Sequence, residues 1–311
     1  MEDSEFMTKT GRSLSLTAML VLMLQGCRAN PGTVLPTDTP PRSLPILDSR
    51  TARPETFEKV VDGLCEAEVV VVGEEHDDLL AHRFQVELVE ALHAERPGLV
   101  LALEMVERDQ QETLDAYLEG SIDTATFVRE VRSSESGRRS FTIHSLPLID
   151  LARSLGIRVI AANAPRAWVR AARIEGYGHL ESMPEETRRL YEIPEQLDDG
   201  PYRRRIVELM QTNGVVPVRE RVDAIMRSQE MWDQTMARSV VNALKEGAEP
   251  VVLIVGRFHG DFGGGTINRI LEEAPDTDIR YLVTIGEAPG GLRLDDADRA
   301  DHVVYTGKPA S

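Results

Sequence analysis

The stretch Val69-Val70-Val71-Val72-Gly73-Glu74-Glu75-His76 decides how this chain can fold. Four consecutive valines are typical of a strand buried on both faces, and such strands belong to parallel sheets covered by helices. The segment from Val251 to His259 repeats the pattern of an apolar strand, a glycine, two residues and a histidine. Because ligands bind outside the carboxyl ends of parallel strands, we expect His76 and His259 to lie at the same edge of a sheet.

Strand and helix patterns alternate along the rest of the chain. Apolar residues recur every four positions from Leu80 to Leu92, which predicts an amphipathic helix after the first strand. The other expected strands are residues 99–103, 157–162, 250–256, 279–285 and 302–305. This alternation predicts an α/β fold with a mainly parallel sheet and helices on both faces. Between the third and fourth core strands, at about residues 175–218, glycines and prolines separate short polar segments and predict a helical insert or lid.

The N-terminal residues have the features of a secretory signal rather than of a fold. A basic stretch at residues 7–12 precedes an apolar run that is too short to span a bilayer. Leu24-Gln25-Gly26-Cys27 then resembles the bacterial lipobox, in which the cysteine is acylated. We therefore expect a lipoprotein signal peptide over residues 1–26, a lipid such as palmitate on Cys27, and anchoring in the bacterial cell envelope at the outer membrane.

The segment that follows is rich in proline, which predicts a tether without helix or strand over residues 27–53. Residues 54–307 remain for the α/β domain. The charge of the chain is strongly negative, with 35 Lys and Arg against 52 Asp and Glu, a formal net charge of −17. A surface of this sign repels phosphate backbones, so no nucleic-acid partner is expected. The two cysteines cannot form a disulfide framework.

Polar side chains also follow the two middle strands. Glu104 comes directly after an apolar strand, where an unpaired carboxylate would be costly. Asn163 ends the next strand, and Arg166 lies in the first turn of the following helix. We use the term rim for the residues predicted at the carboxyl ends of the strands, namely His76, Glu104, Asn163 and His259. Asp233 lies one position off the apolar stripe of a long helix and is expected to orient a rim histidine.

These motifs resemble those of the ChaN-like haem-binding uptake family of bacterial lipoproteins. That family belongs with the Tiki proteases and the erythromycin esterases in a wider set with paired GxxH motifs and an intervening glutamate. The resemblance covers roughly residues 45–290. The matching stretches are residues 72–77, 103–105, 108–111, 161–166, 229–237 and 256–260.

The resemblance implies a haem-binding protein that takes part in haem or iron uptake. It also implies a homodimer with the cofactor at its interface, and an outer-membrane haem receptor as a partner. Haem requires an axial ligand and cations for its two propionates. The candidate haem-binding residues are His76, Asn163, Arg166, Tyr202 and His259, and Tyr202 stands beside the run Arg203-Arg204-Arg205.

Two other interpretations stay open, so the sequence does not decide whether the protein is an enzyme. His76, Glu104 and His259 form a set of two histidines and one carboxylate that could bind Zn²⁺ or Mn²⁺ in a metal-dependent hydrolase of the Tiki or esterase type. Glu75 would then be the general base, and in a metal-free version one histidine would activate water directly. In the third interpretation the rim is a polar network with a structural or partner-binding role.

Overall fold

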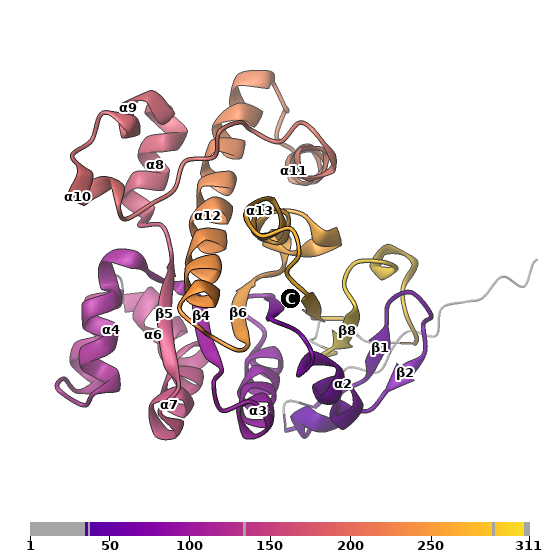
Figure 1. The fold of residues 1–311 in the computed structure, drawn as a ribbon. Coiled ribbons are helices and arrows are strands. Elements are labelled where there is room, and N and C mark those ends of the chain that lie inside the picture. The colour runs from indigo at the N-terminus through magenta and orange to yellow at the C-terminus, as the bar shows by residue number, and fades with distance from the viewer. Residues whose placement is uncertain (1–34, 37, 133–134, 288–289, 308–311) are drawn as a thin grey trace, which may run out of the picture.

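An eight-stranded sheet in the order β2-β1-β8-β7-β3-β6-β4-β5 organises the protein (Figure 1). The computed structural model describes residues 35–36, 38–132, 135–287 and 290–307. The strands are β1 (Ile46–Asp48), β2 (Pro54–Glu55), β3 (Val69–Glu74), β4 (Val100–Glu107), β5 (Arg158–Asn163), β6 (Val251–Gly256), β7 (Ile279–Ile285) and β8 (His302–Tyr305). Only β1 pairs antiparallel, with β2 and β8, and every other neighbouring pair is parallel. The expected mainly parallel sheet is confirmed.

Different helices cover the two faces of the sheet. One face packs against α2 (Phe57–Leu64), α3 (Leu79–Glu95), α4 (Gln111–Leu118), α5 (Thr124–Val131), α6 (Glu135–His144) and α7 (Leu146–Leu155). The other packs against α12 (Arg219–Lys245) and α13 (Thr266–Glu273). In β3, Val70 and Val72 enter the first core while Val69 and Val71 enter the second. Because side chains alternate along a strand, a run of four valines is what a strand between two apolar layers requires.

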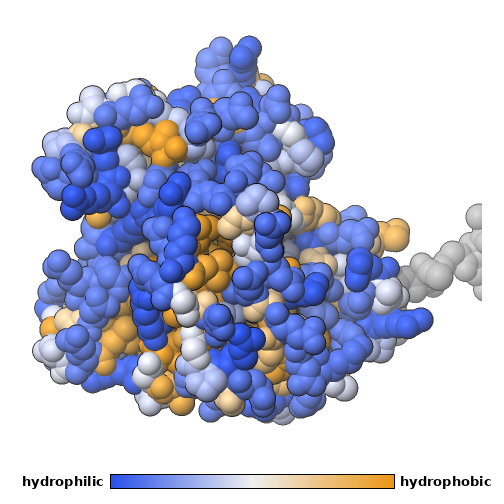
Figure 2. Space-filling view, in the orientation of Figure 1, coloured by the Kyte–Doolittle hydropathy of each residue, from blue (hydrophilic) through white to orange (hydrophobic). Residues whose placement is uncertain are grey.

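The segment between β5 and β6 is helical, as expected. It contains α8 (Arg166–Glu175), α9 (Tyr177–Glu181), α10 (Glu185–Arg188) and α11 (Pro201–Thr212) before α12 begins. In Figure 1 these helices lie above the sheet, beside the upper part of α12. They bury two small apolar clusters of their own against α12. The face of the molecule in Figure 2 is mostly hydrophilic, which agrees with the acidic composition.

The expectation of a tether without strands is wrong at its end. Ile46–Asp48 forms β1 and pairs antiparallel with β8, and Ile46 and Leu47 are buried. The two apolar side chains that follow Pro45 are buried, and their burial favours a short strand beside β8. The predicted signal peptide, Cys27 and the first part of the tether lie outside the described residues. Within the described part of the chain, no helix is long and apolar enough to cross a membrane.

Strand β5 forms one edge of the sheet, and a side chain covers part of it. The amide nitrogen Nε2 of Gln111 donates to the backbone oxygen of Val159 at 3.1 Å. Its Oε1 accepts a hydrogen bond from the backbone nitrogen of Ala161 at 2.7 Å. The Gln111 amide therefore takes the place that a neighbouring strand would occupy, which is one way that proteins protect an exposed edge.

Replacing this side chain tests its role. In Gln111→Ala both backbone groups lose their partner, so we expect the free energy of unfolding to fall by about 1–2 kcal/mol. Urea denaturation followed by circular dichroism measures the change. Glu112→Ala, at an exposed position on the same helix, is the matched control. Equal stability of Gln111→Ala and the wild type would contradict this role.

Candidate functional site

The carboxyl ends of β3, β4 and β6 bring His76, Glu104 and His259 together. β3 leads to His76, Glu104 lies within β4, and His259 ends η3 (Arg257–His259), which follows β6 directly. Gly256 is part of this geometry, because a Cβ atom there would lie 3.0 Å from both Cε1 and Nε2 of the His76 ring. Only glycine lets the imidazole approach the end of β6 so closely.

His76 is oriented by a buried carboxylate. Its Nδ1 lies 3.0 Å from Oε1 of Glu74, the last residue of β3, while its side chain is 70% exposed. Glu74 is held in turn by Gln85, whose Nε2 donates to Oε2 at 2.6 Å, and by His82 at 3.3 Å. The hydrogen bond to Glu74 raises the pKa of His76. Burial acts to raise the pKa of Glu74, but its hydrogen bonds and the nearby histidines outweigh burial and lower it.

His259 has the same kind of support but is buried. Its Nδ1 lies 2.7 Å from Oδ1 of Asp233, and its Nε2 lies 3.8 Å from Oε1 of Glu104. Burial disfavours the charged imidazole, but the carboxylates of Asp233 and Glu104 outweigh it and raise the pKa of His259 to about 9. His259 is therefore an imidazolium at neutral pH. The expected role of Asp233 as the residue that orients a rim histidine is confirmed.

Glu104 lies beside His259. Its Oε2 accepts a hydrogen bond from the backbone nitrogen of Gly256, and its Oε1 faces Nε2 of His259. Each histidine thus has a carboxylate at Nδ1, and His259 has a further one at Nε2. The arrangement is a set of three carboxylates and two imidazoles that can accept, hold and release protons.

Asn163 and Arg166 lie next to this cluster in different ways. Nδ2 of Asn163 donates to the backbone oxygen of Glu104 at 3.1 Å, so the buried amide ties the ends of β4 and β5 together. The side chain of Arg166 is 79% exposed, with Nε 3.4 Å from Oε1 of Glu107. Arg166 therefore stands at the surface beside the rim. Asn163 contributes to the rim by holding the backbone of Glu104.

Two residues have a different place from the one that we expected. Tyr202, expected as an axial ligand, is buried in α11 and donates from its hydroxyl to Oδ2 of Asp233 at 2.7 Å. Burial raises its pKa well above the usual value, so the phenol stays neutral and holds Asp233. Glu75, expected as a general base, has its Oε1 3.3 Å from Nε of Arg257. Glu75 therefore forms an ion pair with Arg257, which is not the environment expected of a general base.

Sequence reasoning missed Glu74 and Thr266. Glu74 stands in the opening motif, and strand alternation places it on the same face as Val70 and Val72, towards α3; that signal was available. Thr266 donates from its hydroxyl to Oδ1 of Asp233 at 2.7 Å and begins α13. Its contact with Asp233 depends on how two distant helices pack, and no local pattern reveals it.

The family model described as "Haem-binding uptake, Tiki superfamily, ChaN" matches residues 60–270, which include every rim residue. The protein belongs to this family. Among solved structures, one described as cofacial heme binding to ChaN of Campylobacter jejuni has 17% sequence identity and a TM-score of 0.57. The match covers 84% of this chain and 96% of that chain, and it shows a shared fold.

More distant structural matches exist as well. A structure of the type III effector HopBA1 has 12% identity and a TM-score of 0.45, with 86% of this chain and 98% of that chain covered. The erythromycin esterase EreC in its open conformation has 13% identity and a TM-score of 0.43, with 76% and 74% covered. No curated protein matches the chain.

The rim of this family member does not fit a metal centre. Among the side chains that the structure describes, no group of three or more His, Cys, Asp or Glu could hold a metal ion. The expected metal set of His76, Glu104 and His259 is not among such groups.

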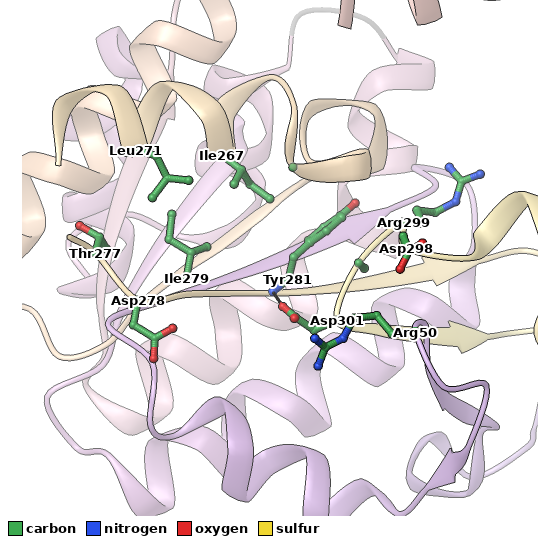
Figure 3. A pocket seen from close by; sticks show the side chains of 12 residues that line it. Arg50, Ile267, Leu271, Thr277, Asp278, Ile279, Tyr281, Asp298, Arg299 and Asp301 are labelled. Atoms are coloured by element: carbon green, nitrogen blue, oxygen red, sulfur yellow. Dashed lines mark hydrogen bonds between the residues drawn. The ribbon is translucent and has the colours of Figure 1, made fainter. Parts of the chain in front are cut away.

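A cavity of about 490 Å³ lies between α13, β7 and the segment before β8 (Figure 3). Ile267, Leu271 and Ile279 form an apolar wall, and neither rim histidine lines it. Tyr281 also lines the cavity, and its hydroxyl donates to Oδ1 of Asp261 at 3.1 Å. The rim histidines are therefore separate from this cavity.

Removing the carboxylate behind His259 should change its titration. In Asp233→Asn the negative charge that outweighs burial is lost, so we expect the pKa of His259 to fall from about 9 to below 7. NMR titration of the imidazole Cε1 proton measures it, and Asp276→Asn, at an exposed position, is the control. A midpoint still near 9 in Asp233→Asn would contradict the assignment.

The same shift predicts how stability depends on pH. The folded-state pKa of His259 lies above the unfolded value of about 6.5, so its contribution is complete below that pH and is lost as the pH rises through about 9. Urea midpoints should therefore fall more steeply for the wild type than for Asp233→Asn across this interval.

Proposed function

We propose that the protein binds haem at the rim, with Nε2 of His76 as the axial ligand of the iron. The observation that carries the proposal is the contrast between the two histidines. His76 is exposed and its Nδ1–H is directed to Glu74, so a neutral ring has its lone pair on Nε2. A carboxylate behind a ligating histidine fixes its tautomer and strengthens it as a ligand.

The other expected axial groups are less suited to this role. His259 is buried and has both nitrogens facing carboxylates. The hydroxyl of Tyr202 is engaged by Asp233 inside the protein. His76 is therefore the expected axial residue that is exposed and can bind the iron of a porphyrin. Arg166 stands beside the rim as an exposed cation. Haem would supply an iron that an imidazole can ligate, and Glu74 would hold the proton of His76 on Nδ1.

The family match supports haem as the ligand. We extend the proposal to a role in haem or iron uptake, as a homodimer in the bacterial cell envelope that receives haem from an outer-membrane receptor. An anchored binding protein holds its ligand near the membrane where that ligand arrives. The structure of the related ChaN carries the description of cofacial haem binding, which is compatible with a dimer.

Metal-free hydrolysis is the second candidate, and one observation favours it. Two imidazoles are each backed by a carboxylate at Nδ1, and one of them, His259, also faces Glu104. His76 can take a proton from water through Nε2, and the imidazolium of His259 can give a proton to a leaving group. Such a pair of a base and an acid is what general acid–base catalysis requires.

Haem titration of His76→Ala tests the first of these functions. The wild type should take up ferric haem stoichiometrically with a shift of the Soret band, and His76→Ala should bind at least about tenfold more weakly. Binding should also weaken as the pH falls, because a proton competes with iron for Nε2 and the pKa of His76 is raised. His179→Ala, in α9 of the insert, is the control.

Two results would count against haem. One is the absence of saturable haem binding by the wild type at micromolar concentration. The other is a tightly bound Zn²⁺ or Mn²⁺ that His76→Ala removes, which would favour the metal-dependent hydrolase.

We also propose that Cys27 is acylated after removal of residues 1–26 and anchors the protein in the outer membrane. The apolar run that ends at Gly26-Cys27 supports this proposal. Cys27→Ser should release the protein from the membrane fraction or stop its processing, as cell fractionation and mass spectrometry of the N-terminus will show. Cys65→Ser is the matched control. A Cys27→Ser protein that is cleaved and remains in the membrane would refute the anchor.

A further inference from the structure

The three consecutive arginines of α11 have three different environments. Arg203 forms an ion pair with Asp223, and the side chain of Arg204 is exposed. Arg205 lies against two aromatic rings, with its Cζ atom 5.5 Å from the ring centroid of Tyr202 and 5.4 Å from that of Phe262. Three arginines that look alike in the sequence therefore have different surroundings, and Arg205 is the one that packs against Phe262.

Two donors of Arg205 have no acceptor among the described residues. Its Nε and Nη2 atoms are buried there and make no hydrogen bond. The nearby carboxylate of Asp261 is already paired with Arg257 at 2.8 Å and with Arg299. A buried donor without a partner is costly and a buried charge more so, so an added anion would stabilise this guanidinium. Burial accordingly lowers the pKa of Arg205.

The glycine turn after Phe262 connects Arg205 to the rim. A Cβ atom on Gly264 would overlap Nη2 of Arg205, and one on Gly265 would overlap the backbone oxygen of His259. The turn therefore touches the guanidinium on one side and His259 on the other. Phe262 is 42% exposed, so an apolar ring faces solvent beside the unpaired cation. Arg205 as a whole is half-buried, so part of its side chain remains exposed to solvent.

We propose that Arg205 binds a carboxylate of a flat apolar ligand, which under the proposed function is a propionate of haem. The guanidinium supplies charge-assisted hydrogen bonds to the carboxylate. Phe262 supplies apolar contact to the adjoining part of the ligand. The inference rests on haem binding at the rim, and it assigns the anion site to Arg205 and not to the exposed Arg166.

Haem and its dimethyl ester, in which both propionates are esterified, test this assignment. Soret titrations in one detergent buffer give the affinity of each ligand for the wild type and for Arg205→Gln. We expect Arg205→Gln to weaken haem binding about tenfold and to leave binding of the ester within twofold. Arg204→Gln on the same helix should change neither affinity. Arg205→Lys keeps the charge without the planar fork and should retain part of the preference for haem.

The outcomes separate the inference from the function on which it rests. Haem binding by Arg205→Gln within twofold of the wild type would overturn the carboxylate site while haem binding stands. An equal loss for haem and ester in a variant with a native circular dichroism spectrum would also overturn it, because the role would then be structural. If Arg205→Gln does not fold, Arg205→Lys decides, and equal affinity for haem and ester in that variant refutes the site. No binding of either ligand by the wild type would overturn the proposed function and this inference together.

Discussion

The parallel pairing of β3 with β6 is the constraint on which the site depends. Its register places Gly73 opposite Val255 and Glu74 opposite Gly256, so both strands end at the same level. The residues that follow can then meet above the sheet, although Glu75 and Arg257 are 182 positions apart in the chain. A shift of one residue would place another side chain where Gly256 lets the imidazole of His76 pack.

Given this register, electrostatics makes the two histidines different. Both follow a glycine at a strand end, and both have a carboxylate on Nδ1. His259 is enclosed between Asp233 and Glu104, which raise its pKa to about 9, while His76 remains at the surface. Tyr202 and Thr266 donate to Asp233 and hold its carboxylate against His259. The insert thus contributes to the site through Tyr202.

Sequence reasoning could predict the features that depend on local patterns. The valine run fixed the identity of β3, and the glycines at the strand ends marked where the two histidines would meet. It failed where the answer depends on packing between distant segments. The role of Tyr202 depends on where α11 rests on α12, and the different environments of Arg204 and Arg205 depend on the rotation of that helix. β1 has three residues, and its pairing with β8 brings together the two ends of the domain.

The position of β3 in the sheet has a consequence for how the protein forms. Both neighbours of β3, the strands β6 and β7, lie in the last quarter of the chain. A nascent chain that has left the ribosome up to α12 contains β3 with its four valines but neither of its partners. Long-range pairing of this kind is slow, and an apolar strand without its partners is prone to aggregation. A product that ends before β6 would therefore keep β3 unpaired and would tend to aggregate.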